Sequence, residues 1–70
     1  MTNISSLPFP IPQWVRWVAQ DRTGVWWGYS VEPLRYDNGW YENEVGEYVR
    51  LGVSEAADWE NSLTKVENLV

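Results

Sequence analysis

The stretch that most constrains this fold runs from residue 14 to residue 31, where two β-rich runs flank one four-residue turn. The turn reads Asp21-Arg22-Thr23-Gly24, with glycine where a type I turn followed by a bulge needs a positive φ. The sequence therefore predicts a β-hairpin closed by Asp21 and Val25. The predicted pairs are Gln20 with Trp26, Ala19 with Trp27, Val18 with Gly28, Trp17 with Tyr29, Arg16 with Ser30 and Val15 with Val31.

Alternation along the two strands sorts the hairpin side chains into two faces. One face is almost wholly apolar, and we expect it to be the core: Val15, Trp17, Ala19, Val25, Trp27, Tyr29 and Val31. The other is mixed, and we expect it to be available for function: Trp14, Arg16, Val18, Gln20, Trp26, Gly28 and Ser30. A slip of one residue would exchange the faces, so their segregation favours this register.

A second hairpin is predicted further along. Asp37-Asn38-Gly39 is a turn signal, and β-rich runs follow at residues 40–45 and 48–53 with a turn at Gly46 between them. The same count pairs Glu42 with Tyr48, Tyr41 with Val49 and Trp40 with Arg50. Tyr41, Val49, Leu51 and Val53 would then face the core. The opposite face would hold Trp40, Glu42, Glu44, Tyr48 and Arg50, with a cation–π contact between Arg50 and Trp40.

At the C-terminal end the hydrophobic period changes. Trp59, Leu63, Val66 and Val70 recur at helical spacing, which predicts an amphipathic helix capped by Ser54 or Asp58. The expected fold class is α+β: an antiparallel β-meander of about four strands in a curved sheet, with the C-terminal helix packed on it.

The expected domain organisation is an extended Pro-rich arm at residues 1–12 and one domain at residues 13–70. Residues 7–12 alternate Pro with large apolar residues, which favours an extended, polyproline-like segment. We expect it to lie over the domain and bury Phe9 and Ile11, with a recognition peptide for a proline-binding partner as the alternative.

Composition limits how so small a domain is held together. A chain of this size rarely gains more than about 3–5 kcal/mol from its core alone, and with no Cys and no His it lacks disulfides and the usual zinc ligands. Six Trp and four Tyr supply apolar area instead. Homodimerisation is a further source of stability. We expect no cofactor and no metal.

Charge is distributed unevenly along the chain, with most of the acids after residue 31. The formal charge is −5, and residues 32–70 hold nine acids against Arg35, Arg50 and Lys65. This balance lacks the basic footprint of a nucleic-acid-binding protein and fits either plain solubility or a basic protein partner. No segment has the apolar length to span a bilayer or the pattern of a signal peptide, so we expect a cytoplasmic protein that does not contact membranes.

Catalysis has few candidate residues. Without His or Cys, the common triads and acid–base pairs are impossible. Glu42 and Glu44 would lie roughly 7 Å apart on one strand face, a spacing also used by inverting glycosidases. Two Glu on a solvated strand are ordinary, however, and the five glycines match no phosphate-binding loop. We predict that the protein is not an enzyme.

The motif Trp17-x-Ala19-x-Asp21-x-x-Gly24-x-Trp26-Trp27-x-Tyr29, followed by Pro33, Trp40, Leu51-Gly52 and Asp58-Trp59-x-x-Ser62-Leu63, resembles a layout found in small proteins of tailed bacteriophages and prophages. The resemblance covers about residues 14–63. It implies a phage origin and a shared fold, and no activity.

The leading functional hypothesis is therefore a phage-encoded interaction module that binds and inhibits a host protein, such as a defence or nucleic-acid-processing complex, by stoichiometric occlusion. The alternatives are a DNA-mimic inhibitor, a carbohydrate-binding module that stacks sugars on Trp14, Trp26 and Trp40, and a virion or assembly component. The candidate partner-binding residues are Trp14, Arg16, Trp26, Trp40, Glu42, Glu44 and Arg50.

Overall fold

The computed structural model of the chain describes residues 7–41 and 46–69. The strands are β1 (Trp17–Gln20), β2 (Val25–Tyr29), β3 (Leu34–Tyr36), β4 (Gly39–Tyr41), β5 (Tyr48–Val53) and β6 (Thr64–Lys65). Two short 3₁₀ helices, η1 (Trp59–Asn61) and η2 (Val66–Asn68), flank β6.

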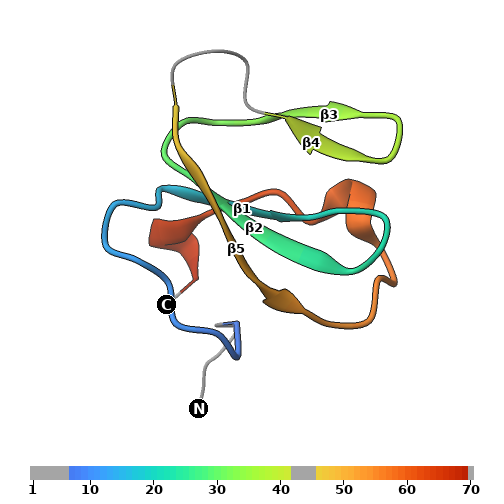
Figure 1. The fold of residues 1–70 in the computed structure, drawn as a ribbon, viewed down its shortest axis with the longest axis horizontal. Helices are drawn as coiled ribbons and strands as arrows, with labels where there is room; N and C mark the ends of the chain where they lie inside the picture. Colours follow the sequence, from blue (N-terminus) through green and yellow to red (C-terminus); the bar gives the residue numbers. More distant parts are fainter. Residues whose placement is uncertain (1–6, 42–45, 70) are drawn as a thin grey trace.

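The strands form two sheets (Figure 1). β5, β2, β1 and β6 lie side by side in that order in a four-stranded sheet, whereas β3 and β4 pair only with each other. All four pairings are antiparallel. The second sheet is an excursion between β2 and β5, and it lies beside the first sheet rather than extending it.

The first hairpin is confirmed. The pairs Trp17–Tyr29, Val18–Gly28, Ala19–Trp27 and Gln20–Trp26 form the predicted register. The backbone N–H of Asp21 donates to the carbonyl of Val25 at 2.9 Å, and Gly24 has the positive φ, 97°, that the turn requires. The ladder ends at Trp17, where the predicted pairing continued to Val15.

The predicted pairing of the second hairpin is wrong for its described residues. Tyr41 lies opposite Leu34 and Trp40 lies opposite Arg35, whereas Arg50 lies opposite Trp27. The Asn38-Gly39 turn joins β4 to the strand before it, and β5 returns to β2. The predicted pair of Glu42 with Tyr48 involves a residue outside the described segments. Arg50 and Trp40 therefore belong to different sheets, and the expected strand pair behind their cation–π contact does not form.

The predicted C-terminal amphipathic helix is also wrong, so the fold is a small β-sheet protein rather than α+β. Trp59 and Val66 begin separate 3₁₀ turns, with β6 between them. The reason is a long-range pairing, because Thr64 lies opposite Val18 and Lys65 opposite Trp17. These contacts give β1 its second neighbour, and a short, solvated helix offers no comparable stabilisation. Val70, the last residue of the predicted stripe, lies outside the described residues.

Both faces of the first hairpin are covered, which contradicts the expected division into a core face and a free face. Val18 and Gln20 belong to the expected free face, yet they are 0% and 4% exposed. Val15 packs on this face, since its side chain lies 2.9 Å from where a Cβ on Gly28 would stand. The ring of Phe9 occupies the space beside Gly52. Phe9 of the Pro-rich segment thus lies over the face that alternation left open.

No described helix is long and apolar enough to cross a membrane.

Candidate functional site

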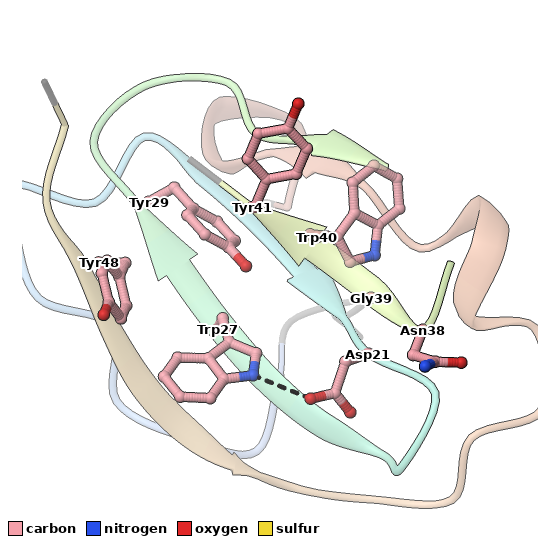
Figure 2. Close-up of a pocket in the computed structure, with 8 residues that line it drawn as sticks. All are labelled: Asp21, Trp27, Tyr29, Asn38, Gly39, Trp40, Tyr41 and Tyr48. Carbon is pink, nitrogen blue, oxygen red and sulfur yellow. Dashed lines mark hydrogen bonds between the residues drawn. The ribbon is translucent and has the colours of Figure 1, made fainter. Parts of the chain in front are cut away.

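An aromatic pocket of about 450 Å³ lies between the two sheets (Figure 2). This volume falls within the ordinary range of small-ligand sites, about 300–1,000 Å³. Its lining residues are Asp21, Trp27, Tyr29, Asn38, Gly39, Trp40, Tyr41 and Tyr48. We call this set the aromatic pocket.

One wall of the pocket comes from the four-stranded sheet. Trp27 and Tyr29 lie two residues apart on β2 and so project from the same face, and Tyr48 of β5 lies directly opposite Tyr29. The ring of Tyr48 meets that of Trp27 edge to face, with centroids 5.8 Å apart, and lies 6.5 Å from that of Tyr29. These contacts hold three rings in a fixed arrangement.

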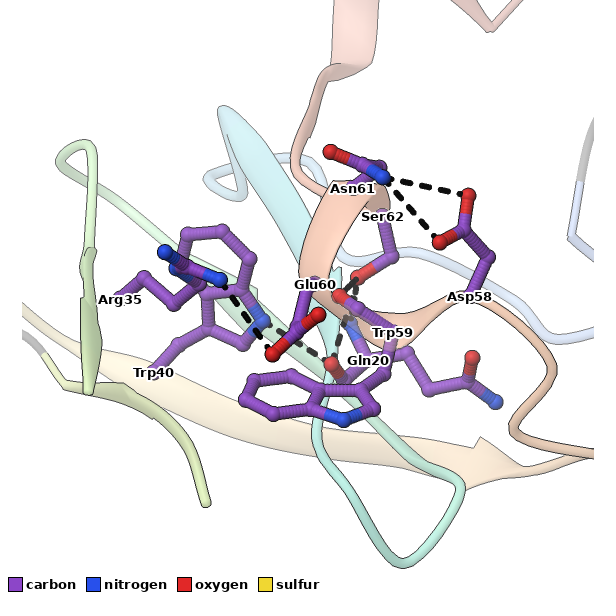
Figure 3. Close-up of polar contacts among 8 residues, drawn as sticks. All are labelled: Gln20, Arg35, Trp40, Asp58, Trp59, Glu60, Asn61 and Ser62. Carbon is purple, nitrogen blue, oxygen red and sulfur yellow. Dashed lines mark hydrogen bonds and ion pairs between the residues drawn. The ribbon is translucent and has the colours of Figure 1, made fainter. Parts of the chain in front are cut away.

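The other wall is β4 with its turn, and polar contacts fasten it to the first hairpin (Figure 3). The indole N–H of Trp40 donates to the carbonyl of Gln20 at 2.9 Å. The backbone N–H of Arg22 donates to the carbonyl of Asn38 at 3.0 Å. The two hairpins approach closely here, because a Cβ at Gly39 would lie 3.0 Å from the Cβ of Asp21 and would force a small shift.

An ion pair between β3 and η1 adds a weaker connection between the β3–β4 hairpin and the rest of the protein. Arg35 Nη1 lies 3.4 Å from Glu60 Oε2 on η1, and both side chains are more than half exposed. Exposed pairs of this kind contribute little to stability. The hydrogen bonds of Trp40 and Arg22 are therefore the main polar attachments of the hairpin to the main sheet.

Asp21 is the charged group of the pocket. Its Oδ1 accepts hydrogen bonds from the backbone and hydroxyl of Thr23 and from the backbone of Val25, and its Oδ2 accepts one from the indole N–H of Trp27. Partial burial alone would raise the pKa of Asp21, but the hydrogen bonds from Thr23, Trp27 and Val25 together hold the pKa below its ordinary value. The carboxylate is therefore ionised at neutral pH.

Tyr29 forms the floor of the pocket. Its side chain is 3% exposed. Burial, followed by the negative charges of Asp21 and of the Tyr48 phenolate, raises the pKa of Tyr29 to about 12. Its hydroxyl therefore keeps its proton under physiological conditions.

The described members of the predicted site are not brought together. Among these described residues, Trp40 alone lines the aromatic pocket. Trp26 lies on the opposite face of β2, where its indole N–H donates to Ser54 Oγ at 2.8 Å. Trp14 and Arg16 are exposed before β1, and Arg50 is exposed on β5. Glu42 and Glu44 lie outside the described residues.

The sequence reading missed most of the pocket. Trp27 and Tyr29 were assigned to the core because they share the more apolar face of the hairpin, and Asp21 was interpreted only as a turn residue. A usable signal was present, since Trp and Tyr carry a polar group that a dry core must satisfy. Such a ring on a predicted core face calls for a polar partner, which Asp21 supplies for Trp27.

Beside the pocket, the outer face of β3 and β4 is apolar and exposed. We call Leu34, Tyr36 and Tyr41 the hairpin face; their exposed fractions are 49%, 66% and 44%. The rings of Tyr36 and Tyr41 meet edge to face with centroids 5.7 Å apart. Tyr41 belongs to both the hairpin face and the pocket, so the two form one continuous surface. Exposed apolar surface of this kind is typical of interaction sites.

Among the described residues, no cluster of three or more His, Cys, Asp or Glu side chains is placed to hold a metal ion. In comparisons with known proteins, no family model, no curated protein and no solved structure matches the chain.

Proposed function

We propose that this protein is an interaction module that binds a host protein through the aromatic pocket and the adjoining hairpin face. In line with the resemblance to small phage proteins, the partner is a protein of the bacterial cytoplasm, and binding blocks that partner by stoichiometric occlusion. The observation that carries the proposal is the continuous aromatic surface formed where the two sheets meet.

The residue types of this surface support protein recognition. Trp and Tyr are enriched in protein interfaces and dominate their binding energy. Tyr48 and Tyr36 are 62% and 66% exposed, which is a large aromatic area to leave in water without a partner. Tyr29 and Trp40 below them are buried or half-buried and held in place, so the surface has a prearranged centre.

Charge supports a partner with a basic or neutral contact surface. None of the described residues lining the pocket is Lys or Arg, and the formal charge of the whole chain is −5. Such a balance attracts basic surfaces and repels nucleic acid.

Carbohydrate binding is less well supported by the same pocket. Sugars need free polar groups around an aromatic platform, but Asp21 already accepts four hydrogen bonds and Asn38 Oδ1 accepts one from Arg22 at 3.0 Å. Trp26 and Trp40, two of the three proposed sugar platforms, lie on different sides of the main sheet.

DNA mimicry also gains little support. It requires a row of acidic side chains that present unpaired charge, and two of the described acids do not, since Glu60 pairs with Arg35 and Glu67 pairs with Lys65.

Affinity capture with matched variants tests the proposal. Tagged protein is used on nuclease-treated bacterial lysate, and bound proteins are identified and quantified by mass spectrometry. Tyr48→Ala removes an exposed ring of the pocket, and Val53→Ala removes an exposed apolar side chain at the other end of the same strand, β5. We expect one stoichiometric partner that is lost with Tyr48→Ala and kept with Val53→Ala. Equal capture by both folded variants would contradict the proposal.

A further inference from the structure

We infer that the aromatic pocket binds a quaternary ammonium group, carried by a trimethylated lysine side chain of the protein partner. The inference rests on the proposed function and names the chemistry that the pocket recognises. Three features carry it: the set of aromatic rings, a fixed negative charge, and the shortage of free hydrogen-bond acceptors.

The first feature is the set of aromatic rings that line the pocket. Five aromatic residues of the described segments line the pocket: Trp27, Tyr29, Trp40, Tyr41 and Tyr48. The negative face of an aromatic ring attracts a cation, with Trp the strongest, and cages of several rings are a known means of holding methylated ammonium groups. In Figure 2 Trp27, Tyr29 and Tyr48 lie on one wall of the pocket, and Trp40 and Tyr41 lie on the other. A cation held between the walls lies close to rings from both sheets.

The second feature is a negative charge inside the same space. Asp21 lines the pocket with a carboxylate whose pKa lies below its ordinary value, so the charge persists at neutral pH. Tyr29 beside it stays protonated and adds no charge of its own. Without a lining Lys or Arg to neutralise Asp21, the described part of the pocket favours a cation over a neutral or anionic ligand.

The third feature selects among cations. Asp21 accepts four hydrogen bonds from Thr23, Val25 and Trp27, three on Oδ1 and one on Oδ2, which leaves about one acceptor position, on Oδ2. The side-chain oxygen of Asn38 accepts from Arg22. The pocket therefore supplies negative potential with little remaining capacity to accept hydrogen bonds, apart from the phenolic oxygens.

This combination disfavours ordinary lysine and arginine. A lysine ammonium brings three N–H donors and a guanidinium brings five, and burial without partners is costly for each. A trimethylammonium group keeps the positive charge and has no donor to satisfy. Its methyl groups also bury apolar surface against the rings. The pocket is thus better matched to the methylated cation than to the unmethylated one.

The surroundings of the pocket favour a side chain of a protein over a free small molecule. The hairpin face continues from the pocket through Tyr41 to Tyr36 and Leu34, all exposed. A peptide segment that inserts a lysine into the pocket would cover these residues with its neighbouring side chains. A small free cation would leave them in water.

Titration of the purified full chain with three matched ligands tests the inference. The ligands are a lysine peptide with a trimethylated side chain, the same peptide unmethylated, and the same peptide carrying a neutral tert-butyl group in place of the trimethylammonium. Calorimetry is expected to show the trimethylated peptide binding about tenfold or more tightly than either of the others. Equal binding of the tert-butyl peptide would overturn the role of charge, and equal binding of the unmethylated peptide would overturn the preference for methylation.

Variants at Tyr48 separate ring chemistry from shape. Tyr48→Phe keeps the aromatic face and is expected to bind nearly as well as wild type, whereas Tyr48→Leu keeps an apolar side chain without the face and is expected to bind about five- to tenfold less tightly. Equal affinities of the two variants for the trimethylated peptide would overturn the inference.

Nuclear magnetic resonance locates the binding. The indole N–H signals of Trp27 and Trp40 are expected to shift with the trimethylated peptide, while that of Trp26 on the opposite face stays in place. Shifts centred on Trp26 would overturn the assignment to this pocket.

Two further results distinguish failure of the inference from failure of the proposed function. If a host protein is captured through Tyr48 but no trimethylated peptide binds, the proposed function stands and the inference fails. If choline alone binds as tightly as the peptide, the pocket takes a free quaternary amine and the assignment to a protein side chain fails.

Discussion

The indole N–H of Trp27 donates to Asp21 Oδ2 at 3.1 Å, while Oδ1 of the same carboxylate accepts from the backbone and hydroxyl of Thr23 and the backbone of Val25. One side chain therefore closes the first turn and orients a ring of the aromatic pocket. The residues that establish the hairpin and those that form the candidate site are coupled through this contact.

Replacement of Asp21 by Asn is expected to lower the free energy of unfolding by about 1–3 kcal/mol, because charge-assisted hydrogen bonds become weaker and the amide N–H₂ opposes a donor. Urea denaturation followed by circular dichroism measures the change. Asp37→Asn, in the exposed second turn, is the matched control and is expected to change stability by less than about 0.5 kcal/mol. Equal stabilities of the two variants would show that the carboxylate of Asp21 is not needed for the turn.

Stability is expected to fall in alkaline solution because of Tyr29. Its pKa is about 12 in the folded protein against 10.0 as the ordinary value. Below pH 10 both states keep the proton and this group causes no pH dependence. Between about pH 10 and pH 12 the unfolded state loses the proton first, so the free energy of unfolding falls by up to about 1.4 kcal/mol per pH unit.

Denaturation measured at several pH values in wild type and Tyr29→Phe tests this expectation. The Phe variant should show a shallower decline than wild type above pH 10. Parallel declines would assign the alkaline loss to other groups.

The arm contact between Phe9 and Gly52 is expected to tolerate no added side-chain volume. A Cβ at residue 52 would occupy the space of the Phe9 ring, so Gly52→Ala should displace the arm and cost about 1–3 kcal/mol. Nuclear magnetic resonance should then show the ring signals of Phe9 moving toward their random-coil positions. Combining Gly52→Ala with Phe9→Ala should cost less than the sum of the two single changes, as expected for residues in contact. Strict additivity would contradict the contact.

The side chain of Gln20 is expected to contribute to the free energy of unfolding, although it is polar. Its side-chain amide is buried and donates to the carbonyls of Gly24, Ser54 and Glu55 at 3.1–3.2 Å. Gln20→Leu removes the donor from these three carbonyls, of which that of Gly24 is buried, at a cost of about 1–3 kcal/mol. Gln13→Leu, at an exposed position, is the control and should leave the denaturation midpoint nearly unchanged. A Gln20→Leu protein as stable as the control would contradict this account.

The local parts of the fold could be predicted from the sequence. The Asp21–Gly24 turn determines which residues face each other over β1 and β2, since its requirements are met within a few residues. The partner of β4 could not be decided in this way. The Asn38-Gly39 signal marks a turn. Whether a strand precedes this turn depends on Leu34–Tyr36, and the sequence indicates a break there because the segment follows Pro33.

Long-range contacts explain the other differences. The spacing from Trp59 to Val66 suits a helix, yet Thr64 and Lys65 pair with β1, more than 40 residues earlier in the chain. The free face of the first hairpin is covered because Phe9 meets Gly52. Neither contact leaves a periodic signal. For the same reason, Trp40 is the one pocket residue among the described members of the predicted site, since the pocket forms where the two sheets approach each other.

The β3–β4 hairpin completes its own ladder and is joined to the main sheet mainly through Trp40 and the second turn. Substitutions at Leu34, Tyr36 and Tyr41 therefore leave the pairing of β1, β2 and β5 untouched. In evolutionary terms, the scaffold and the proposed recognition element are separable. A lineage facing a partner that changes could diversify this hairpin rapidly while the first turn, Gln20 and the arm contact remain under constraint.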